Sequence, residues 1–370
     1  MNNDTEKERI KKNVKAILSR ANICFLLGAG ASVKIEPEKK NFPLMEDLMG
    51  AVKANKEVIG FWESITEKGK DVSTQYGMVK NLLDRYLMPE KANVEQFLSL
   101  LDSVEQFIVD EDFRKKTACC CEQVKASIKQ RIQESDTENI LPIYKKFYQA
   151  IRHLKEMSGN TSKATSVFTT NYDMLNEQAM EDLGIHYYAG FYGIVNRRFN
   201  LAYYDHEYVN THKIKNASYI VDNDHINLFK LHGSLSWFYD EKKNELVEKN
   251  PYAEDFSPEI IYPSSMKFQK TNAIVYYSSL MREFSDKICQ EDTALIVIGT
   301  SLSDEHINKL IENALSISRF TLIIFGFDAN QIRDFEHKYD KHNNVLIYPE
   351  GKTFEELADF LLEIEGDSHE

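Results

Sequence analysis

The chain has 370 residues, of which 42% are hydrophobic and 28% charged, so it can form two domains, or one domain with a large insertion. Its formal net charge of −13 argues against a general binder of nucleic acid or anionic membranes, because both favour excess Lys and Arg. Residues 1–8 are polar, unlike a signal peptide, and no run of about 18 apolar residues occurs. We therefore expect a cytoplasmic protein with no membrane span and no direct nucleic-acid binding.

The first predicted elements are a helix, a strand and a turn. Residues 6–21 have apolar side chains on one helical face. The apolar run 22–27 predicts a buried parallel strand, since both faces of such a strand are covered. In the turn Gly28–Ser32, Gly28 and Gly30 can adopt positive φ and allow close backbone approach.

A helix starting in this turn would offer free N–H groups to a phosphate. The dinucleotide fingerprint also needs a third glycine, and Val33 stands at that position. A tight turn without a ligand therefore remains an alternative. The charged segment 34–43 that follows contains two prolines and either borders a binding cleft or simply connects two elements.

Residues 44–157 have mostly helical periodicity and few strand signals. This stretch predicts a helical insertion that is close to a small domain in size. It would serve as a lid, a substrate-binding module or an oligomer interface.

The cysteines are few and odd in number. They are Cys24, Cys119, Cys120, Cys121 and Cys289. Their spacing fits neither a disulfide framework nor paired zinc knuckles, so reduced thiols are the simplest interpretation. The triplet lies in a helical stretch, and small helix residues explain it better than a metal site does.

Strands and helices alternate again from Thr165 onward. Strands are predicted at 166–169, 226–231, 294–298, 320–325 and 344–348, with a further short one at 260–263. Helices are predicted at 174–182, from near Asp304, and at 329–339 and 353–364. Residues 184–225 predict loops and short strands. This alternation predicts an α/β fold with a doubly wound parallel sheet.

Four predicted strands end in small or polar residues. These ends are Gly28–Ser32, Thr169–Asp173, His232–Ser234 and Gly299–Ser301. Ligands of doubly wound sheets bind at the carboxyl ends of the strands. We therefore expect Asn171, Asp173, His232 and Ser301 around one cleft that faces the glycine turn.

The same segments resemble the sirtuin family. Gly28-Ala29-Gly30-Ala31-Ser32, Thr169-Thr170-Asn171-Tyr172-Asp173, Lys230-Leu231-His232-Gly233-Ser234 and Gly299-Thr300-Ser301-Leu302 occur in sirtuin order. The resemblance spans residues 22–348 apart from the insertion. It implies a Rossmann-like NAD-binding domain of residues 1–43 and 158–370, with 44–157 as a helical insertion.

The chain also departs from the sirtuins that deacylate proteins. Those sirtuins have a Gly-Ile-Pro-Asp-Phe-Arg segment after the first turn, and in this chain only Pro43 could correspond to part of it. They also have a four-cysteine zinc ribbon after the catalytic histidine. Cys289 is the single cysteine after His232, so this ribbon is missing and no zinc is expected. The variants, including Ser301-Leu302-Ser303-Asp304-Glu305-His306-Ile307, are more similar to sirtuin-like effectors of bacterial antiphage defence. Members of that group hydrolyse NAD.

The resemblance implies roles for individual residues. Asn171 would hold the nicotinamide ribose and orient a water, His232 would be the base near that ribose, and Asp173 would support the loop or a ribose hydroxyl. The pyrophosphate cradle would be Gly28, Ala29, Gly30 and Ser32, and the adenosine side would be Gly299, Thr300 and Ser301.

Structural alternatives exist for the polar residues. Asn171 and Asp173 could cap the helix that follows, and Asp304 is expected to be a cap and not a ligand. His232 could be a hydrogen-bonded turn histidine.

The leading hypothesis is an NAD glycohydrolase that releases nicotinamide and ADP-ribose and acts by abortive infection. The alternatives are an NAD-dependent protein deacylase and a non-catalytic sensor of NAD or ADP-ribose. Because the chain ends soon after the predicted sheet, we expect the trigger to come from assembly. The family implies a homo-oligomer, or a complex with a HerA-like hexameric ATPase.

Overall fold

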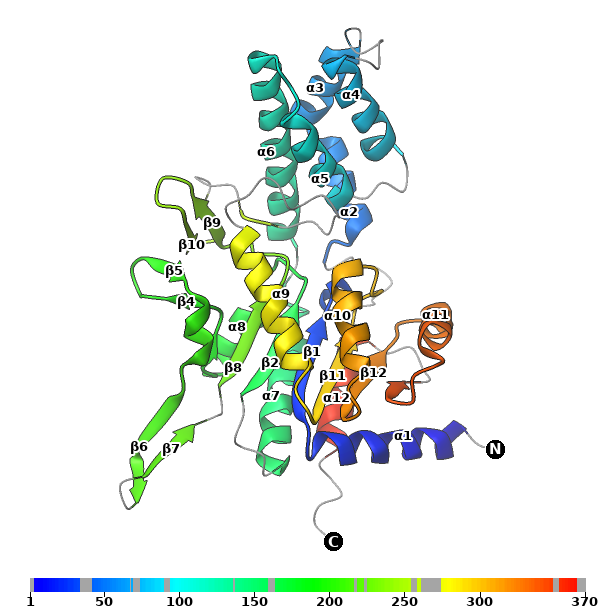
Figure 1. The fold of residues 1–370 in the computed structure, drawn as a ribbon, viewed down its shortest axis with the longest axis vertical. Helices are drawn as coiled ribbons and strands as arrows, with labels where there is room; N and C mark the ends of the chain where they lie inside the picture. Colours follow the sequence, from blue (N-terminus) through cyan, green and yellow to red (C-terminus); the bar gives the residue numbers. More distant parts are fainter. Residues whose placement is uncertain are drawn as a thin grey trace.

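The computed structural model combines a parallel sheet, helices on both of its faces, and a helical bundle at one edge (Figure 1). It describes residues 3–33, 42–66, 68, 74–89, 94–135, 137–158, 164–215, 218–222, 225–253, 258–260, 274–348 and 353–364. Among the helices of these residues, none has the length and apolar character that crossing a membrane requires.

The main sheet has seven parallel strands in the order β13-β12-β11-β1-β2-β8-β3. Their bounds are β1 (Asn22–Leu27), β2 (Thr165–Thr169), β3 (Tyr187–Tyr188), β8 (Ile226–Lys230), β11 (Thr293–Ile298), β12 (Phe320–Phe325) and β13 (Val345–Ile347). After β1 the chain builds the sheet in one direction, and from β11 it builds the other side. The predicted doubly wound α/β fold is confirmed, and the order reverses between β1 and β11.

Alternate residues of each central strand enter two separate cores. In β1, Phe25 and Leu27 belong to one core, while Cys24 and Leu26 belong to the other. The first core is closed by α1 (Asn3–Leu18), α7 (Leu141–Ser158), α8 (Leu175–Asp182) and α12 (Phe354–Glu363). The second is closed by α9 (Ile274–Ile288), α10 (Glu305–Leu315) and α11 (Ala329–Tyr339). Burial on both faces explains why these strands read as continuous apolar runs.

Several short elements were not predicted individually. A four-stranded sheet consists of β4 (Phe191–Tyr192), β5 (Arg197–Phe199), β9 (Trp237–Asp240) and β10 (Glu245–Glu248). A separate hairpin consists of β6 (Tyr208–Lys215) and β7 (Ser218–Asp222). In the predicted strand 260–263, Ile260 makes an isolated bridge to Gly233, and residues 261–263 lie outside the described residues. Of these strands, β4 and β5 have only two and three residues, which are too few to show a period.

The predicted insertion folds as a bundle followed by a helix that returns to the sheet. The bundle helices are α2 (Met45–Ala54), α3 (Lys56–Thr66), α4 (Gln75–Leu82), α5 (Val94–Glu105) and α6 (Glu111–Gln133). In contrast, α7 packs on α8 and α12, so it belongs to the layer that covers the sheet. The division of the chain at residues 43 and 158 stays a prediction. The bundle faces the carboxyl ends of the strands (Figure 1).

Two glycine turns meet where the strand order reverses. A Cβ atom added to Gly28 would lie 2.5 Å from Gly299 O, and one added to Gly299 would lie 2.3 Å from Ala31 N. The Gly30 N–H donates to Gly299 O at 2.8 Å. The turn after β1 therefore packs backbone to backbone on the turn after β11, which larger residues would prevent.

We expect Gly299→Ala to destabilise the protein by roughly 2–4 kcal/mol, combining left-handed backbone strain with overpacking. Gly299 has φ +71°, and its added Cβ would clash with backbone. Chemical denaturation measures the effect. Gly60→Ala in α3 is the matched control, since its added Cβ meets nothing within 4 Å, and it should stabilise by about 0.5–1 kcal/mol. Equal effects of the two substitutions would contradict the packing described.

Candidate functional site

The turn after β1 is tighter than the sequence predicts. A four-residue 3-10 helix, Ala29–Ser32, follows Gly28, where an α-helix was considered. Gly28 has φ −106°, and Gly30 is not among the glycines with positive φ, so the expected use of positive φ is wrong for both. These glycines are needed for close approach. The Ala31 N–H donates to Gly28 O at 2.9 Å, so the N–H groups of Gly30 and Ala31 already bond within the protein, and Ala29 is exposed.

Asn171 and Ser32 join the turns after β1 and β2. The Asn171 Nδ2 group donates to Gly28 O and to Ser32 Oγ, both at 3.1 Å. Ser32 Oγ also contacts Asp173 Oδ2 at 3.1 Å and Tyr144 OH at 2.7 Å. A hydroxyl has one proton, so with Asp173 ionised Ser32 donates to it and Tyr144 donates to Ser32. Ser32 is fully buried, which favours a structural role for its side chain.

Asp173 combines two roles that the sequence left as alternatives. Its Oδ1 accepts from the Leu175 N–H at 3.0 Å, at the start of α8, while Oδ2 accepts from Ser32. Burial raises the pKa of the Asp173 carboxyl, and the nearby Lys230 ammonium opposes that shift. The residue therefore supports the loop that carries Asn171. The Asn171 side chain does not cap α8, since its bonds run to Gly28 and Ser32.

His232 is paired with a carboxylate from a distant strand end. Its Nε2 lies 3.1 Å from Asp304 Oδ2, and the side chains of both residues are largely buried. Since β1 and β2 separate β8 from β11, the segment after β11 crosses roughly 14 Å of the sheet edge to reach His232. The His232–Asp304 pair therefore brings groups from both sides of β1 and β2 together.

Asp304 is a helix cap, as predicted, and also a partner of His232. Its Oδ1 accepts from the N–H groups of His306 and Ile307 at 2.9 and 3.1 Å. Burial acts to raise the pKa of Asp304, but the hydrogen bond and charge of His232, with the two backbone N–H groups, lower it to about 2. Asp304 is thus an ionised carboxylate that can hold the His232 ring in one orientation.

The remaining predicted residues follow β11. Gly299 and Thr300 are half-buried, and Gly299 contacts the glycine turn as described above. Ser301 is exposed and donates to Ser303 Oγ at 3.1 Å. Ser301 therefore lies on the same edge of the sheet as the other residues, while its described hydrogen bond stays within its own loop.

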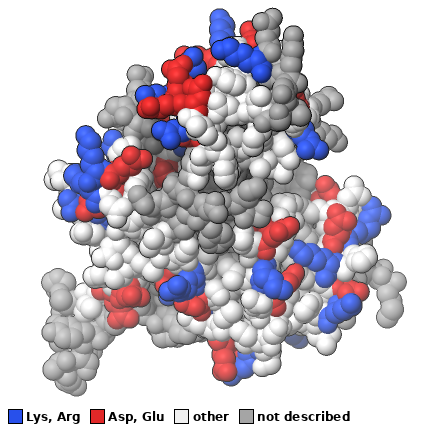
Figure 2. Space-filling view, turned by 45° about the horizontal axis from the view of Figure 1, so that its top comes forward, with Lys and Arg blue, Asp and Glu red and all other residues white. Residues whose placement is uncertain are grey.

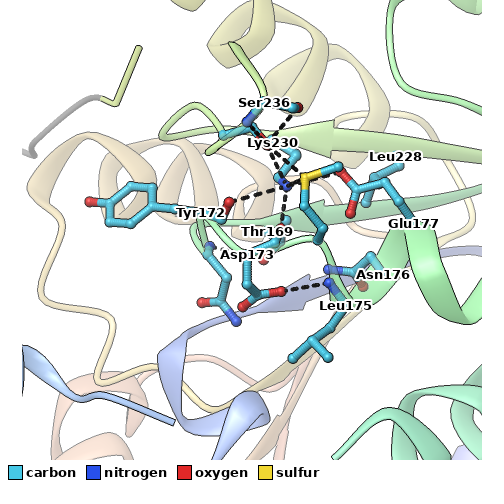
Figure 3. Close-up of polar contacts among 12 residues, drawn as sticks. Thr169, Tyr172, Asp173, Leu175, Asn176, Glu177, Leu228, Lys230 and Ser236 are labelled. Carbon is cyan, nitrogen blue, oxygen red and sulfur yellow. Dashed lines mark hydrogen bonds and ion pairs between the residues drawn. The ribbon is translucent and has the colours of Figure 1, made fainter. Parts of the chain in front are cut away.

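Two buried residues next to the site were missed as site residues from the sequence. Tyr144, on α7, reaches Ser32 across more than a hundred positions of the chain, and no local motif marks it. Lys230 begins the segment Lys230–Ser234 that resembles sirtuins, but the resemblance implies no role for it. Figure 3 shows its ammonium group among polar atoms of the segment after β2 and of α8. Its position at the carboxyl end of an apolar strand was the available signal.

The helical bundle borders this edge of the sheet. A half-open pocket is lined by Ile132 and Gln133 of α6, by Asp173 and Leu175, and by Tyr252, among others. The Gln133 Nε2 group donates to Pro251 O at 2.5 Å. The end of α6 therefore lies beside the loop that carries Asn171.

Two cysteines of the triplet have a packing role. Cys120 and Cys121 are buried in the bundle core and Cys119 is exposed. Burial raises the pKa of the Cys120 thiol to about 12, which makes it unreactive. Within the described part of the chain, no group of three His, Cys, Asp or Glu residues could hold a metal ion.

The fold and the strand-end site define a Rossmann-like α/β protein with a candidate nucleotide site at the carboxyl edge of its sheet. Residues 165–348 match the family described as SIR2-like domain. This match supports the sirtuin-like resemblance and indicates an NAD-dependent activity in the broad sense. It covers Asn171, His232 and the turn after β11, and it begins after the glycine turn and the bundle. No curated protein matches the sequence.

The arrangement offers an amide and an imidazole held by the protein's own polar groups. Asn171 is 6% exposed and His232 is 4% exposed, so both are shielded from bulk water. An amide can donate and accept without charge, and an imidazole can take a proton near neutral pH. Such a pair can orient and deprotonate a water or a hydroxyl.

We expect Asp304→Asn to lose about 2 kcal/mol of stability at pH 6, because a pKa lowered to about 2 reports stabilisation of the ionised carboxylate. That stability is present above the unfolded pKa of about 3.9 and is lost as the pH falls through the folded value. Urea unfolding at several pH values should show the difference from wild type shrinking below about pH 4.

Asp328→Asn is the control for the cap. Asp328 accepts from two N–H groups at the start of α11, at 2.8 and 2.9 Å, as Asp304 does for α10. Asn also caps helices well, so this control should change stability by less than about 0.5 kcal/mol. A pH-independent loss in Asp304→Asn would contradict the role of the His232 pair.

Proposed function

We propose that the protein hydrolyses NAD to nicotinamide and ADP-ribose. The observation that carries the proposal is the joining of four strand ends: Asn171 contacts the turn after β1, and His232 is paired with the segment after β11. These are the positions that the sirtuin resemblance assigns to the ribose and the base. The match to SIR2-like domains supports an NAD-dependent activity.

The reaction breaks the bond between ribose C1′ and the nicotinamide nitrogen. The bonding electrons leave with the pyridinium nitrogen, so neutral nicotinamide departs and the sugar becomes oxocarbenium-like, as in glycoside hydrolysis. Water then adds to C1′ and gives up one proton. The leaving group needs little acid assistance, so the site must mainly hold the ribose and position the water.

In this proposal Asn171 orients the water or the ribose hydroxyl, and His232 accepts the proton. The described bonds of the Asn171 side chain use its amide nitrogen. With that nitrogen directed to Gly28 and Ser32, the carbonyl oxygen is the group that would accept from a water. Asp304 would fix the orientation of the His232 ring, in the manner of a carboxylate that orients a general base. Positioned proton transfer contributes typically about 10²–10⁴-fold in rate.

Hydrolysis is favoured over protein deacylation by the residues after His232. Cys289 is the single cysteine in that part of the sequence, so the zinc ribbon that accompanies the acyl-lysine groove is missing. The proposed acceptor is therefore water.

We expect Asn171→Ala and His232→Ala each to lower nicotinamide release from NAD at least about 100-fold. The reason is that each removes a polar group proposed to touch the ribose or water. Chromatography of nicotinamide and ADP-ribose measures the rate. His337→Ala, an exposed histidine in the last turn of α11, should leave the rate unchanged. Full activity in the Asn171 and His232 variants would refute the site, and turnover that requires an acylated peptide would refute hydrolysis.

We further propose that the protein is an antiphage effector that is activated by assembly, either with itself or with a HerA-like hexameric ATPase. On the face in Figure 2, the Lys and Arg side chains of the described residues are interspersed with Asp and Glu. The described residues also form ion pairs at the surface, such as Lys115–Glu111 and Lys116–Asp112 on α6. Together with the net charge of −13, this favours a protein partner over DNA.

We expect NAD hydrolysis per chain to rise with protein concentration, or on addition of such an ATPase, because assembly would supply the trigger. Light scattering combined with the nicotinamide assay tests this. If the activity per chain stays the same at protein concentrations where the chain is monomeric and where it is fully assembled, and does not change when the ATPase is added, activation by assembly is refuted.

A further inference from the structure

The Lys230 side chain is a buried cation at the carboxyl end of β8. It is 1% exposed, and its partner Glu177, in the first turn of α8, is 4% exposed. Lys230 Nζ lies 2.9 Å from Glu177 Oε1. A buried ion pair usually adds little to stability compared with well-packed apolar residues of the same size. Stability alone therefore does not explain this buried ion pair, and the positions of the groups that it contacts do.

The other contacts of Lys230 run to the two segments that carry the site residues. The ammonium donates to the main-chain carbonyl of Asp173 and, at 3.5 Å, to that of Tyr172, the two residues directly after Asn171. It also donates to Ser234 Oγ at 2.9 Å, two residues after His232. Figure 3 shows these contacts converging on one nitrogen. One charged group therefore contacts the backbone directly after Asn171 and a side chain two residues after His232.

Main-chain bonds and the Lys230 side chain both contribute to this junction. Among the described residues, the Leu231 N–H donates to Thr169 O at 2.8 Å, and the Leu235 N–H donates to Tyr172 O at 3.0 Å. Lys230 adds side-chain bonds to both segments, and Glu177, in the first turn of α8, bonds to the same ammonium. The second carboxylate oxygen of Glu177 has no hydrogen-bond partner among the described residues, so this carboxylate depends on Lys230.

We propose that Lys230 is a positioning residue, which holds the Asn171 loop and the His232 turn at the separation that NAD hydrolysis requires. The inference rests on the proposed function, because the reaction defines what that separation is for. Lys230 is 1% exposed and its ammonium bonds to Asp173, Glu177 and Ser234, so it would act through Asn171 and His232 and not by contact with the reacting atoms. A displacement of about 1 Å in such groups can cost about 100-fold in rate.

The test compares Lys230→Met with the double variant Lys230→Met/Glu177→Gln. The single variant leaves Glu177 charged and unpaired, so its melting temperature should fall markedly. The double variant removes both charges and should recover most of that loss. Its kcat for NAD should nevertheless stay about 10–100-fold below wild type, with KM changed by less than about threefold. If stability and kcat recover together, Lys230 is only structural and the proposal is overturned.

Amide hydrogen exchange provides a readout that is independent of turnover. In the double variant, the amides of residues 170–176 and 232–236 should exchange at least about tenfold faster than in wild type, while the remaining core is unchanged. Unchanged exchange in these segments overturns the positioning role, whatever the kcat. If wild type releases no nicotinamide, the proposed function fails while exchange still decides the role of Lys230.

Two further variants complete the experiment. Ser234→Ala removes one contact of the ammonium, together with the contacts of the Ser234 hydroxyl with Ser236 and Met174, and leaves the Lys230–Glu177 pair intact. It should therefore fold and lower kcat by a smaller factor than the double variant does. Lys155→Met is the matched control, because Lys155 donates to the His225 carbonyl at 3.0 Å, beside the opposite end of β8. It should change neither kcat nor exchange at 170–176. A loss of kcat in Lys155→Met equal to that in the double variant would overturn the assignment to Lys230.

Discussion

The backbone contact between the turns after β1 and β11 is the constraint on which the rest of the site depends. Gly28 and Gly299 approach so closely that an added Cβ on either would clash with backbone. The contact lies where the strand order reverses, which is where neighbouring connections diverge to opposite faces of the sheet. It sets where the segment 299–304 leaves the sheet, and hence where Asp304 can meet His232. Small residues are needed here because two main chains, and not side chains, pack together.

Around this contact, the polar groups of the site satisfy one another. Ser32 bonds to Asn171, Asp173 and Tyr144, while Lys230 ties the following backbone to Glu177. Buried polar groups are costly unless they are bonded, so each such bond restricts the position of the next group. The result is a site held in place before any ligand arrives, which is the condition for electrostatic and positional catalysis. The same network couples α7, α8 and the ends of β1, β2 and β8, so the site and the core are stabilised together.

The bundle adds a second body beside this network. The end of α6 and the loop after β2 line one pocket, and α6 also bonds to the chain near residue 251. A partner that binds the bundle and displaces α6 would therefore act close to Asn171. Because Gln133 of α6 and Asp173 line the same pocket, this arrangement would let the proposed assembly affect the proposed chemistry.

The sequence by itself determined the strand and helix alternation, the doubly wound sheet and the strand ends that carry Asn171 and His232, because burial on both faces produces apolar runs that local reading can detect. It also predicted that residues 44–157 are mainly helical, although α7 packs on the sheet layer and not in the bundle. Only the tertiary structure decided that Gly28 serves close approach and not positive φ, that Asp304 pairs with His232, and that Tyr144 and Lys230 support the site. Each of these depends on contacts between residues far apart in the chain, and such contacts leave no periodic or local pattern.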